Sequence, residues 1–339
     1  MRTDCSRRLV LGALGASGLT PGLALARQSS PLYRDGSAGS RGICTLALSP
    51  AGDRLATAGI DGWVRLWDAA SVQPVHSRQV SSEEALCIAW SPDGARIAVG
   101  TAEAALHVLS AADLSPVSQT ACEAMVTGVG FTADGAVVST GPDGDLTLTA
   151  GGGVRRVLPD VGGWSMTVSP DGRFAAVGGP TRLIDLADGS VTATQGSATR
   201  EIHAIAFSAD GGLVVSTHWS GEIRLWRPAG GAPPTVLRPM IAFRAAGPRN
   251  AMPVEAPVPM AGLAVSPDGK VVAVGAADRK LRFWDAATGA LLSTSRAHGR
   301  TIAAMAYSPD GARLFTADLG GTVRVWTVSG GVLPEGQGL

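Results

Sequence analysis

Short apolar runs alternate with turn sequences along most of this chain, and residues 46–68 show the pattern most clearly. In this stretch, apolar residues 46–48 are followed by a Ser-Pro-Ala-Gly turn, a second apolar run at 55–58 and the hairpin signal Asp61-Gly62. Residues 63–67 then alternate large apolar side chains with Arg65. The pattern predicts three short antiparallel strands, which cannot bury their apolar face alone and therefore need neighbours of their own kind.

The neighbours are present, because the same turn recurs along the chain. Its seven copies begin at residues 49, 91, 132, 169, 208, 266 and 308. Each copy precedes a second apolar run and a third strand, the latter at 64–67, 106–109, 146–149, 182–185, 223–226, 281–284 and 323–326. A period near 40 residues with four strands per unit is typical of a β-propeller. The predicted fold class is therefore all-β, a seven-bladed propeller of four-stranded antiparallel blades, and the repeated turns are structural.

The ends of the third strands resemble the WD40-repeat family over nearly the whole mature sequence. The Trp-Asp pair of that family stands at Trp67-Asp68 and Trp284-Asp285. It is altered in the other blades, to Leu109-Ser110, Thr149-Ala150, Ile184-Asp185, Trp226-Arg227 and Trp326-Thr327. Because this fold hosts many unrelated functions, the resemblance predicts the architecture far more strongly than the activity.

The resemblance implies a buried polar network in each blade. Its members are a Trp on the third strand, a hydroxyl on the second, an Asp in the turn between them and a His before the first strand. The matching residues are Thr57, Asp61 and Trp67 in blade 1, Asp278 and Trp284 in blade 6, and His298, Thr316 and Trp326 in blade 7. No blade shows the full set: Val274 replaces the hydroxyl in blade 6, and Gly320 stands where blade 7 should carry its Asp. These residues are interpreted as structural.

Three features of the ring are expected to depart from a regular repeat. The tail after Trp326 is too short for a full outer strand, so residues 30–34 are expected to supply it and to close the ring, as in WD40-like propellers. Residues 227–262 form a Pro-rich insertion, with an outer strand at 235–237 or 240–243 and an excursion of about 15 residues. Blade 4 has a turn about three residues shorter than that of blade 1.

Residues 1–26 resemble an export signal, which leaves 27–339 as a single propeller domain. Arg7 and Arg8 precede a mildly apolar segment that ends in Ala24-Leu25-Ala26, a small-x-small cleavage pattern. The adjacent arginines resemble the twin-arginine motif, although an ordinary Sec signal with two arginines remains an alternative. The prediction is a periplasmic or secreted bacterial protein, with no membrane span in the mature chain.

Composition excludes several other functions. The formal net charge is +0, and no basic stripe appears, so nucleic-acid binding is not supported. The five histidines show no metal-ligand spacing, and there is no Cys-x-x-Cys motif. After the signal, Cys44, Cys87 and Cys122 remain and are expected to be free thiols. We therefore predict no catalytic residues, no metal and no cofactor.

Two functions from different classes remain. The favoured one is a non-enzymatic scaffold or accessory factor that binds another protein and is a monomer by itself. The alternative is a ligand-binding or enzymatic propeller, lactonase-like or quinoprotein-like, with a site in the axial cavity. The residues expected to face the axis are Cys44, Leu86, Thr127, Trp164, His203, Ala261 and Ala303. This ring holds no carboxylate and one imidazole, which suits neither metal nor acid–base chemistry.

One sector of the ring is predicted to bind the partner. The repeat places aromatic, charged and histidine side chains from blades 4 and 5 and from the insertion on one rim: Trp164, Glu201, His203, His218, Trp219, Arg244 and Arg249. Trp is the residue type most enriched at binding hot spots. The competing interpretation is that the two tryptophans fill space between blades.

Overall fold

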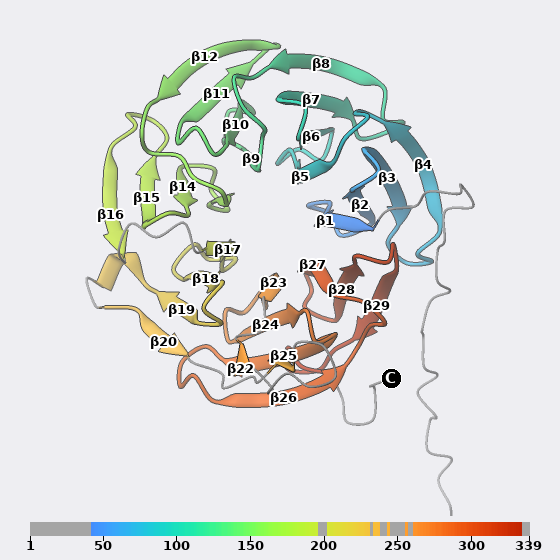
Figure 1. Ribbon diagram of the computed structural model, residues 1–339, viewed down its shortest axis with the longest axis vertical. Helices are drawn as coiled ribbons and strands as arrows, with labels where there is room; N and C mark the ends of the chain where they lie inside the picture. The colour runs from blue at the N-terminus through green and yellow to red at the C-terminus, as the bar shows by residue number, and fades with distance from the viewer. Residues whose placement is uncertain are drawn as a thin grey trace, which may run out of the picture.

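In the computed structural model, seven β-sheets surround a central axis and form a closed ring (Figure 1). The structure describes residues 42–195, 202–230, 233–237, 243–244, 255–256 and 260–333. This arrangement confirms the predicted seven-bladed propeller of antiparallel blades. Within the described ranges, no helix is long and apolar enough to cross a membrane.

Blades 1 to 3 each contain four strands in chain order, with the first strand innermost (Figure 1). Blade 1 consists of β1 (Ile43–Leu48), β2 (Arg54–Gly59), β3 (Trp63–Asp68) and β4 (Pro74–Gln79). Blade 2 consists of β5 (Ala85–Trp90), β6 (Arg96–Thr101), β7 (Ala105–Ser110) and β8 (Pro116–Ala121). Blade 3 consists of β9 (Gly128–Phe131), β10 (Val137–Thr140), β11 (Leu146–Ala150) and β12 (Gly153–Leu158).

Blades 4 to 7 continue the ring. Blade 4 consists of β13 (Met166–Val168), β14 (Phe174–Val177), β15 (Thr181–Asp185) and β16 (Val191–Gln195). Blade 5 consists of β17 (Ile202–Phe207), β18 (Val214–His218), β19 (Ile223–Trp226) and β20 (Thr235–Leu237), with the 3-10 turn η1 (Pro228–Gly230) before β20. Blade 6 consists of β23 (Met260–Val265), β24 (Val271–Ala276), β25 (Lys280–Asp285) and β26 (Leu291–Arg296). Blade 7 consists of β27 (Ile302–Tyr307), β28 (Arg313–Asp318) and β29 (Val323–Thr327).

The repeated turn joins the first and second strands of every blade and has one conformation throughout. In blade 2, the Ser91 hydroxyl donates to the Asp93 carboxylate at 2.5 Å and accepts from the Arg96 backbone N–H at 2.8 Å. Gly94 has a φ of 70°, a left-handed conformation that suits glycine. The glycine of every other copy also has a positive φ, between 69° and 79°. The interpretation of these turns as structural is therefore supported by their geometry.

The core lies between blades rather than within them. In β18 and β24 every described side chain is buried, because the second strand of a blade is covered on both faces by the adjoining blades. In β4, an outer strand, every residue is exposed. Burial therefore depends on position in the blade as well as on the alternation of side chains along a strand.

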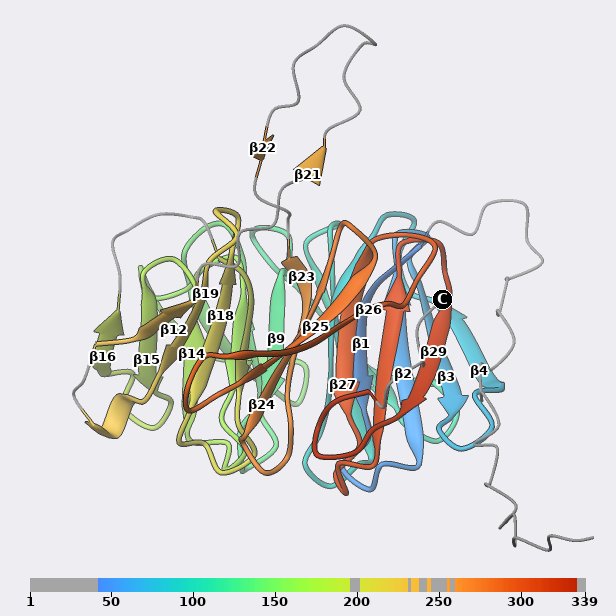
Figure 2. The same ribbon diagram turned by 90° about the horizontal axis from the view of Figure 1, so that it is seen from below.

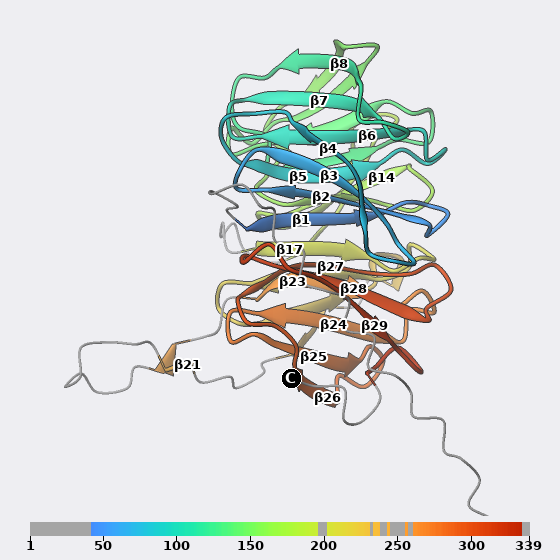
Figure 3. The same ribbon diagram turned by 90° about the vertical axis from the view of Figure 1, so that its right-hand side faces the viewer.

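The first and last blades pack together and close the ring, as the side view in Figure 3 shows. One apolar cluster combines Leu55 and Trp67 of blade 1 with Phe315 and Val323 of blade 7. Arg313 in β28 also donates a hydrogen bond to the backbone carbonyl of residue 69 at 2.8 Å. The last sheet has three strands among the described residues. The predicted closing strand at residues 30–34 lies outside those residues.

The irregular blades match the expectations in part. Val177 pairs with Arg182 in blade 4, whereas Thr57 pairs with Arg65 in blade 1, so the turn of blade 4 is three residues shorter, as predicted. The outer strand of blade 5 is β20, one of the two expected positions. Within the insertion, the short strands β21 (Phe243–Arg244) and β22 (Glu255–Ala256) pair with each other and stand out from one rim of the ring (Figure 2). We call this side, from which β23 begins, the upper rim.

Candidate functional site

Blade 7 contains a complete buried polar network. The Trp326 Nε1–H donates to Thr316 Oγ1 at 2.9 Å, and Thr316 Oγ1 lies 2.7 Å from His298 Nε2. His298 Nδ1 lies 3.0 Å from Asp318 Oδ2, and both of these side chains are buried. The prediction that no blade has the full set is therefore wrong. Asp318, the last residue of β28, supplies the carboxylate expected at position 320.

The network of blade 1 is smaller, and the aspartates of blades 1 and 6 have other partners. Trp67 Nε1 donates to Thr57 Oγ1 at 2.9 Å, as predicted. Asp61, however, forms an ion pair with Arg65 at 2.7 Å, and the equivalent Asp278 pairs with Arg282. The prediction that these two aspartates join the Trp network is therefore corrected: in the turn, an arginine four residues later is the carboxylate's partner.

Trp284 of blade 6 is buried, with Val274 beside it in the register position of a hydroxyl. It therefore packs in an apolar environment, against residues of β18 and β19 from blade 5. These observations agree with a structural role for Trp284.

The predicted partner-binding sector contains an exposed aromatic pair. The Trp219 side chain follows β18 and is 54% exposed. Its ring lies 4.6 Å from the His203 ring, centroid to centroid, at an interplanar angle of 40°. Burial lowers the pKa of His203, so this imidazole is neutral at pH 7. The pair is therefore an uncharged aromatic surface.

Trp164, in the loop before β13, is 44% exposed. A backbone hydrogen bond and a side-chain contact connect its loop to blade 5. The N–H of Gly178 donates to the Ser165 carbonyl at 2.7 Å, and a Cβ placed on Gly178 would lie 3.0 Å from Ile202. Ile202 in turn pairs with the residue that precedes Trp219. The loops that carry the two exposed tryptophans are therefore connected along the boundary between blades 4 and 5.

The remaining predicted residues of this sector are not shown at the exposed surface. His218 is 3% exposed, and its Nε2 lies 3.0 Å from Ser216 Oγ, so the prediction that it contacts a partner is wrong. Burial, with a contribution from Arg224, lowers its pKa to about 4. Glu201 and Arg249 lie outside the described residues, and Arg244 is described only as part of β21.

The axial channel is lined mainly by apolar side chains of the first strands. Its volume is about 720 Å³, and residues such as Leu46, Trp90, Phe131, Ile205 and Met305 form its wall.

Cys44 is half-buried, and burial together with Glu84 and Asp61 raises the pKa of its thiol to about 12. Among the described residues, no group of three His, Cys, Asp or Glu side chains is placed to hold a metal ion.

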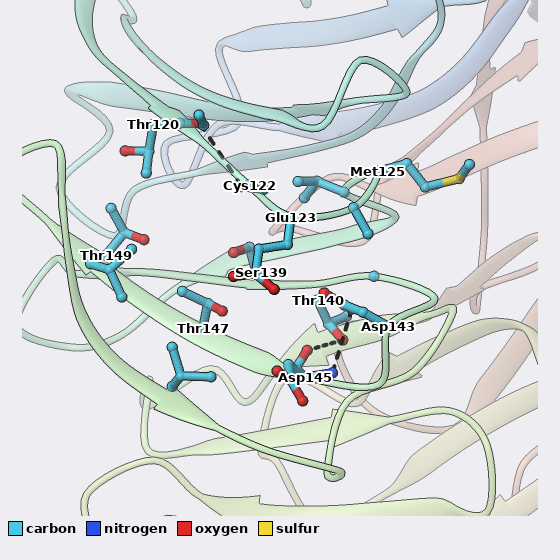
Figure 4. Close-up of a pocket in the computed structure, with 16 residues that line it drawn as sticks. Thr120, Cys122, Glu123, Met125, Ser139, Thr140, Asp143, Asp145, Thr147 and Thr149 are labelled. Carbon is cyan, nitrogen blue, oxygen red and sulfur yellow. Dashed lines mark hydrogen bonds between the residues drawn. The ribbon is translucent and has the colours of Figure 1, made fainter.

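A cavity that the sequence analysis did not identify lies in blade 3 (Figure 4). Its volume is about 300 Å³, and it opens toward solvent beside the connection from β8 to β9. Cys122, Ser139 and Thr149 lie in its wall. Cys44, Cys87 and Cys122 are all free thiols, as predicted. The signal for this cavity was present in the sequence, because Thr149 stands where four other blades have a Trp.

Comparison with known proteins identifies the repeat. The family model "WD domain, G-beta repeat" matches residues 189–227, 258–285 and 289–327. A second model, "Anaphase-promoting complex subunit 4 WD40 domain", matches residues 32–91. The fold therefore defines the class, a seven-bladed β-propeller. Parts of the chain match models of WD40 repeats.

Individual relatives are more distant. The chain is 26% identical to human WD repeat-containing protein 90 over 315 residues, which cover 84% of this chain and 18% of that protein. It is 27% identical to telomerase protein component 1 of Mus musculus over 73% of this chain and 9% of that protein. An uncharacterised WD repeat-containing protein of Synechocystis is 28% identical over 46% of this chain and 41% of that protein. The chain thus spans less than half the length of these relatives.

A solved structure shows the same fold. The Cps50 (Swd1) β-propeller domain of Myceliophteria thermophila matches with a TM-score of 0.69 and 17% sequence identity, over 88% of this chain and 100% of that chain. At this identity, the similarity concerns the fold alone. WD40 propeller proteins are generally protein-interaction scaffolds, and none of these matches favours the enzymatic alternative.

Proposed function

We propose that this protein is an exported, non-enzymatic scaffold that binds another protein through the boundary between blades 4 and 5 on its upper rim. The observation that supports this proposal is Trp219, an indole 54% exposed on a propeller whose third-strand tryptophans are all buried or half-buried. Large apolar side chains at the surface of a soluble protein mark interaction sites when they gather in one place. Here Trp164 provides a second exposed indole on a connected loop.

The contact between Trp219 and His203 favours binding in two ways. Because the rings lie 4.6 Å apart, the indole loses little conformational freedom when a partner covers it. Because the pKa of His203 is lowered by burial, no charge has to be desolvated beneath the indole at pH 7. The pair therefore has two properties of a hot spot, an aromatic anchor and a neutral ring in contact with it.

Trp219→Ala is expected to weaken partner binding by about 2 kcal/mol or more, roughly a 30-fold rise in Kd. The free energy of unfolding should change little, because the indole is largely in solvent. The partner is first captured from periplasm with the wild-type propeller as bait, and its Kd for each variant is then measured by calorimetry. Trp226→Ala is the matched control: this buried indole should cost about 3–5 kcal/mol of stability.

A large drop in the melting temperature of the Trp219→Ala variant would show that this indole is a packing residue. Unchanged affinity with unchanged stability would remove the hot spot as well. Trp164→Ala extends the test to blade 4, where a smaller loss of affinity is expected because the indole lies at the edge of the proposed surface.

Export is the second part of the proposal and rests on residues 1–26. We expect Arg7→Lys combined with Arg8→Lys to leave the protein in the cytoplasm, since the twin-arginine route reads that pair. Cell fractionation followed by immunoblotting measures the periplasmic share. A normal periplasmic yield from the double variant, with a loss of yield on deletion of residues 9–20, would assign the signal to the Sec route instead.

A further inference from the structure

The cavity in blade 3 lies where other blades hold a tryptophan. Thr149 pairs with Val137, just as Trp67 pairs with Leu55 and Trp326 with Leu314. Thr149 therefore occupies the register position of the third-strand Trp, with a side chain much smaller than an indole. The volume of the blade 3 cavity, about 300 Å³, is roughly twice that of an engineered cavity of about 150 Å³ that binds benzene. The space is thus large enough for a planar group of several atoms.

The inner wall of this cavity offers hydrogen-bond acceptors. Thr149 is 3% exposed, and its buried hydroxyl has no partner within the part of the chain that the structure describes. Ser139 is also 3% exposed and occupies the register position of Thr57, the residue that accepts the Trp67 N–H in blade 1. An unpaired buried hydroxyl destabilises the folded chain, so a ligand that donates a hydrogen bond to it is favoured.

The outer part of the cavity is acidic. Glu123, Asp143 and Asp145 line it, and no Lys, Arg or His is among the lining residues (Figure 4). The Asp145 carboxylate accepts from the Asp160 backbone N–H at 3.1 Å, which fixes its position. Because ionised carboxylates only accept hydrogen bonds, this lining requires a ligand that is cationic and rich in donors.

We propose that the blade 3 cavity binds the side chain of an arginine presented by a partner protein. A guanidinium has five N–H donors in a planar fork and no acceptor, so it can bond to a carboxylate and to the inner hydroxyls at once. Its methylene stem would lie along Val154 and Val157, which border the cavity and are exposed. A lysine ammonium is a compact point charge and cannot span these separated acceptors.

This inference rests on the proposed scaffold function, and it gives the partner protein a second contact site on the propeller. The cavity belongs to blade 3, whereas the aromatic pair belongs to blade 5, so a partner that reaches both must cover blade 4 between them. Blade 4 has the shortened turn on this side of the ring. An extended segment with an arginine is the kind of partner chain that suits this path.

The test uses N-acetyl-arginine methylamide as the probe and N-acetyl-citrulline methylamide as its neutral isostere. Binding to the full chain is followed by NMR, through the backbone amide shifts of residues 120–126 and 139–149. We expect the arginine probe to bind with a Kd of about 1 mM, and at least about tenfold more tightly than citrulline, since charge-assisted hydrogen bonds are roughly twice as strong as neutral ones. The lysine analogue should bind more weakly than arginine.

Two variants test the assignment from opposite directions. Thr149→Trp restores the indole of the other blades, and should raise the melting temperature while abolishing the amide shifts caused by the arginine probe. Glu123→Gln combined with Asp143→Asn keeps the cavity but removes two charges, and should reduce the preference for arginine over citrulline. Both of these carboxylates are exposed, so the fold should not change.

Equal binding of arginine and citrulline would overturn the proposal, and so would arginine binding that survives Thr149→Trp. Equal binding of the lysine analogue would overturn the assignment to arginine. None of these outcomes depends on the captured partner, so they are independent of the Trp219 experiment. If the probe binds as expected while Trp219→Ala leaves partner affinity unchanged, the cavity site stands and the aromatic hot spot fails.

Discussion

Replacing Asp318 with Ala is expected to destabilise the propeller by about 3–5 kcal/mol. The Asp318 carboxylate is 2% exposed and has several partners at once: His298 Nδ1 at 3.0 Å and the backbone N–H groups of Gly320 and Thr322 at 2.9 and 3.0 Å. Removing it would leave the buried donors of His298 and Thr322 without an acceptor, and each such group costs about 1–3 kcal/mol, whereas water can reach the exposed Gly320. The free energy of unfolding is measured by urea denaturation at pH 7.

Asp310 provides the matched control within the same blade. It accepts from Ser308 Oγ and from the Ala312 backbone N–H, but it is exposed, so water can replace it. Asp310→Ala should therefore cost about 1 kcal/mol or less. Asp318→Asn should recover part of the loss, because its amide oxygen can still accept a hydrogen bond. Equal costs for Asp318→Ala and Asp310→Ala would mean that the network contributes no more than an ordinary turn.

Acidification is expected to destabilise the protein through His218. Burial and the nearby Arg224 lower the pKa of this imidazole to about 4, from an ordinary value of 6.5. The unfolded chain therefore binds a proton between pH 6.5 and pH 4 that the folded chain does not bind, and stability falls as the pH falls through this window. The loss contributed by His218 should reach at most about 3 kcal/mol near pH 4 and about 2 kcal/mol at pH 5.

His218→Asn isolates this contribution, because asparagine does not titrate and can still bond to Ser216. Urea denaturation at pH 7, 6 and 5 should show a flatter pH dependence for the variant than for the wild type. The other histidines with lowered pKa values, such as His298, are present in both proteins and cancel in the comparison. Parallel pH profiles for the two proteins would mean that His218 is protonated in the folded state as readily as in the unfolded chain.

The repeated turn made the fold predictable from the sequence. A Ser or Thr and a Gly at fixed spacing, with a Pro or Ala between them, set one backbone conformation, and the apolar runs on either side set two strands. Seven copies then require a ring, because each small sheet is stable only against its neighbours. The register of blade 4 followed in the same way, since counting from Ser169 to Ile184 already showed the shorter turn.

The network of blade 7 was not predictable by the same counting. The expected Asp position was taken from Asp61, four residues after the hydroxyl Thr57, whereas Asp318 lies two residues after Thr316. Both positions can bring a carboxylate to the same turn, and only the structure shows which one meets His298. His218 was misplaced for a related reason: in a second strand, blades cover both faces, so neighbouring side chains do not alternate between buried and exposed.

The blade 3 cavity illustrates a different limit. The substitution of Trp by Thr149 was visible in the sequence, but a missing large side chain can be compensated by its neighbours. Blades 2 and 4 show this, since Leu109 and Ile184 in the same register position are fully buried. Only the packing shows that blade 3 retains the space, because its substitute is both small and polar.

The uneven distribution of the Trp networks affects how the ring opens. The networks described above lie in blades 1 and 7, the two blades that meet where the ring closes, whereas blades 2 to 4 lack the Trp. In repeat architectures, each unit is stabilised by its own interactions and by its contacts with the next unit. The ring is thus reinforced at its seam, where fraying of the chain ends would otherwise begin. We therefore expect local opening to occur first in the middle of the chain, so that the amide hydrogens of blades 3 and 4 exchange with solvent before those of blades 1 and 7.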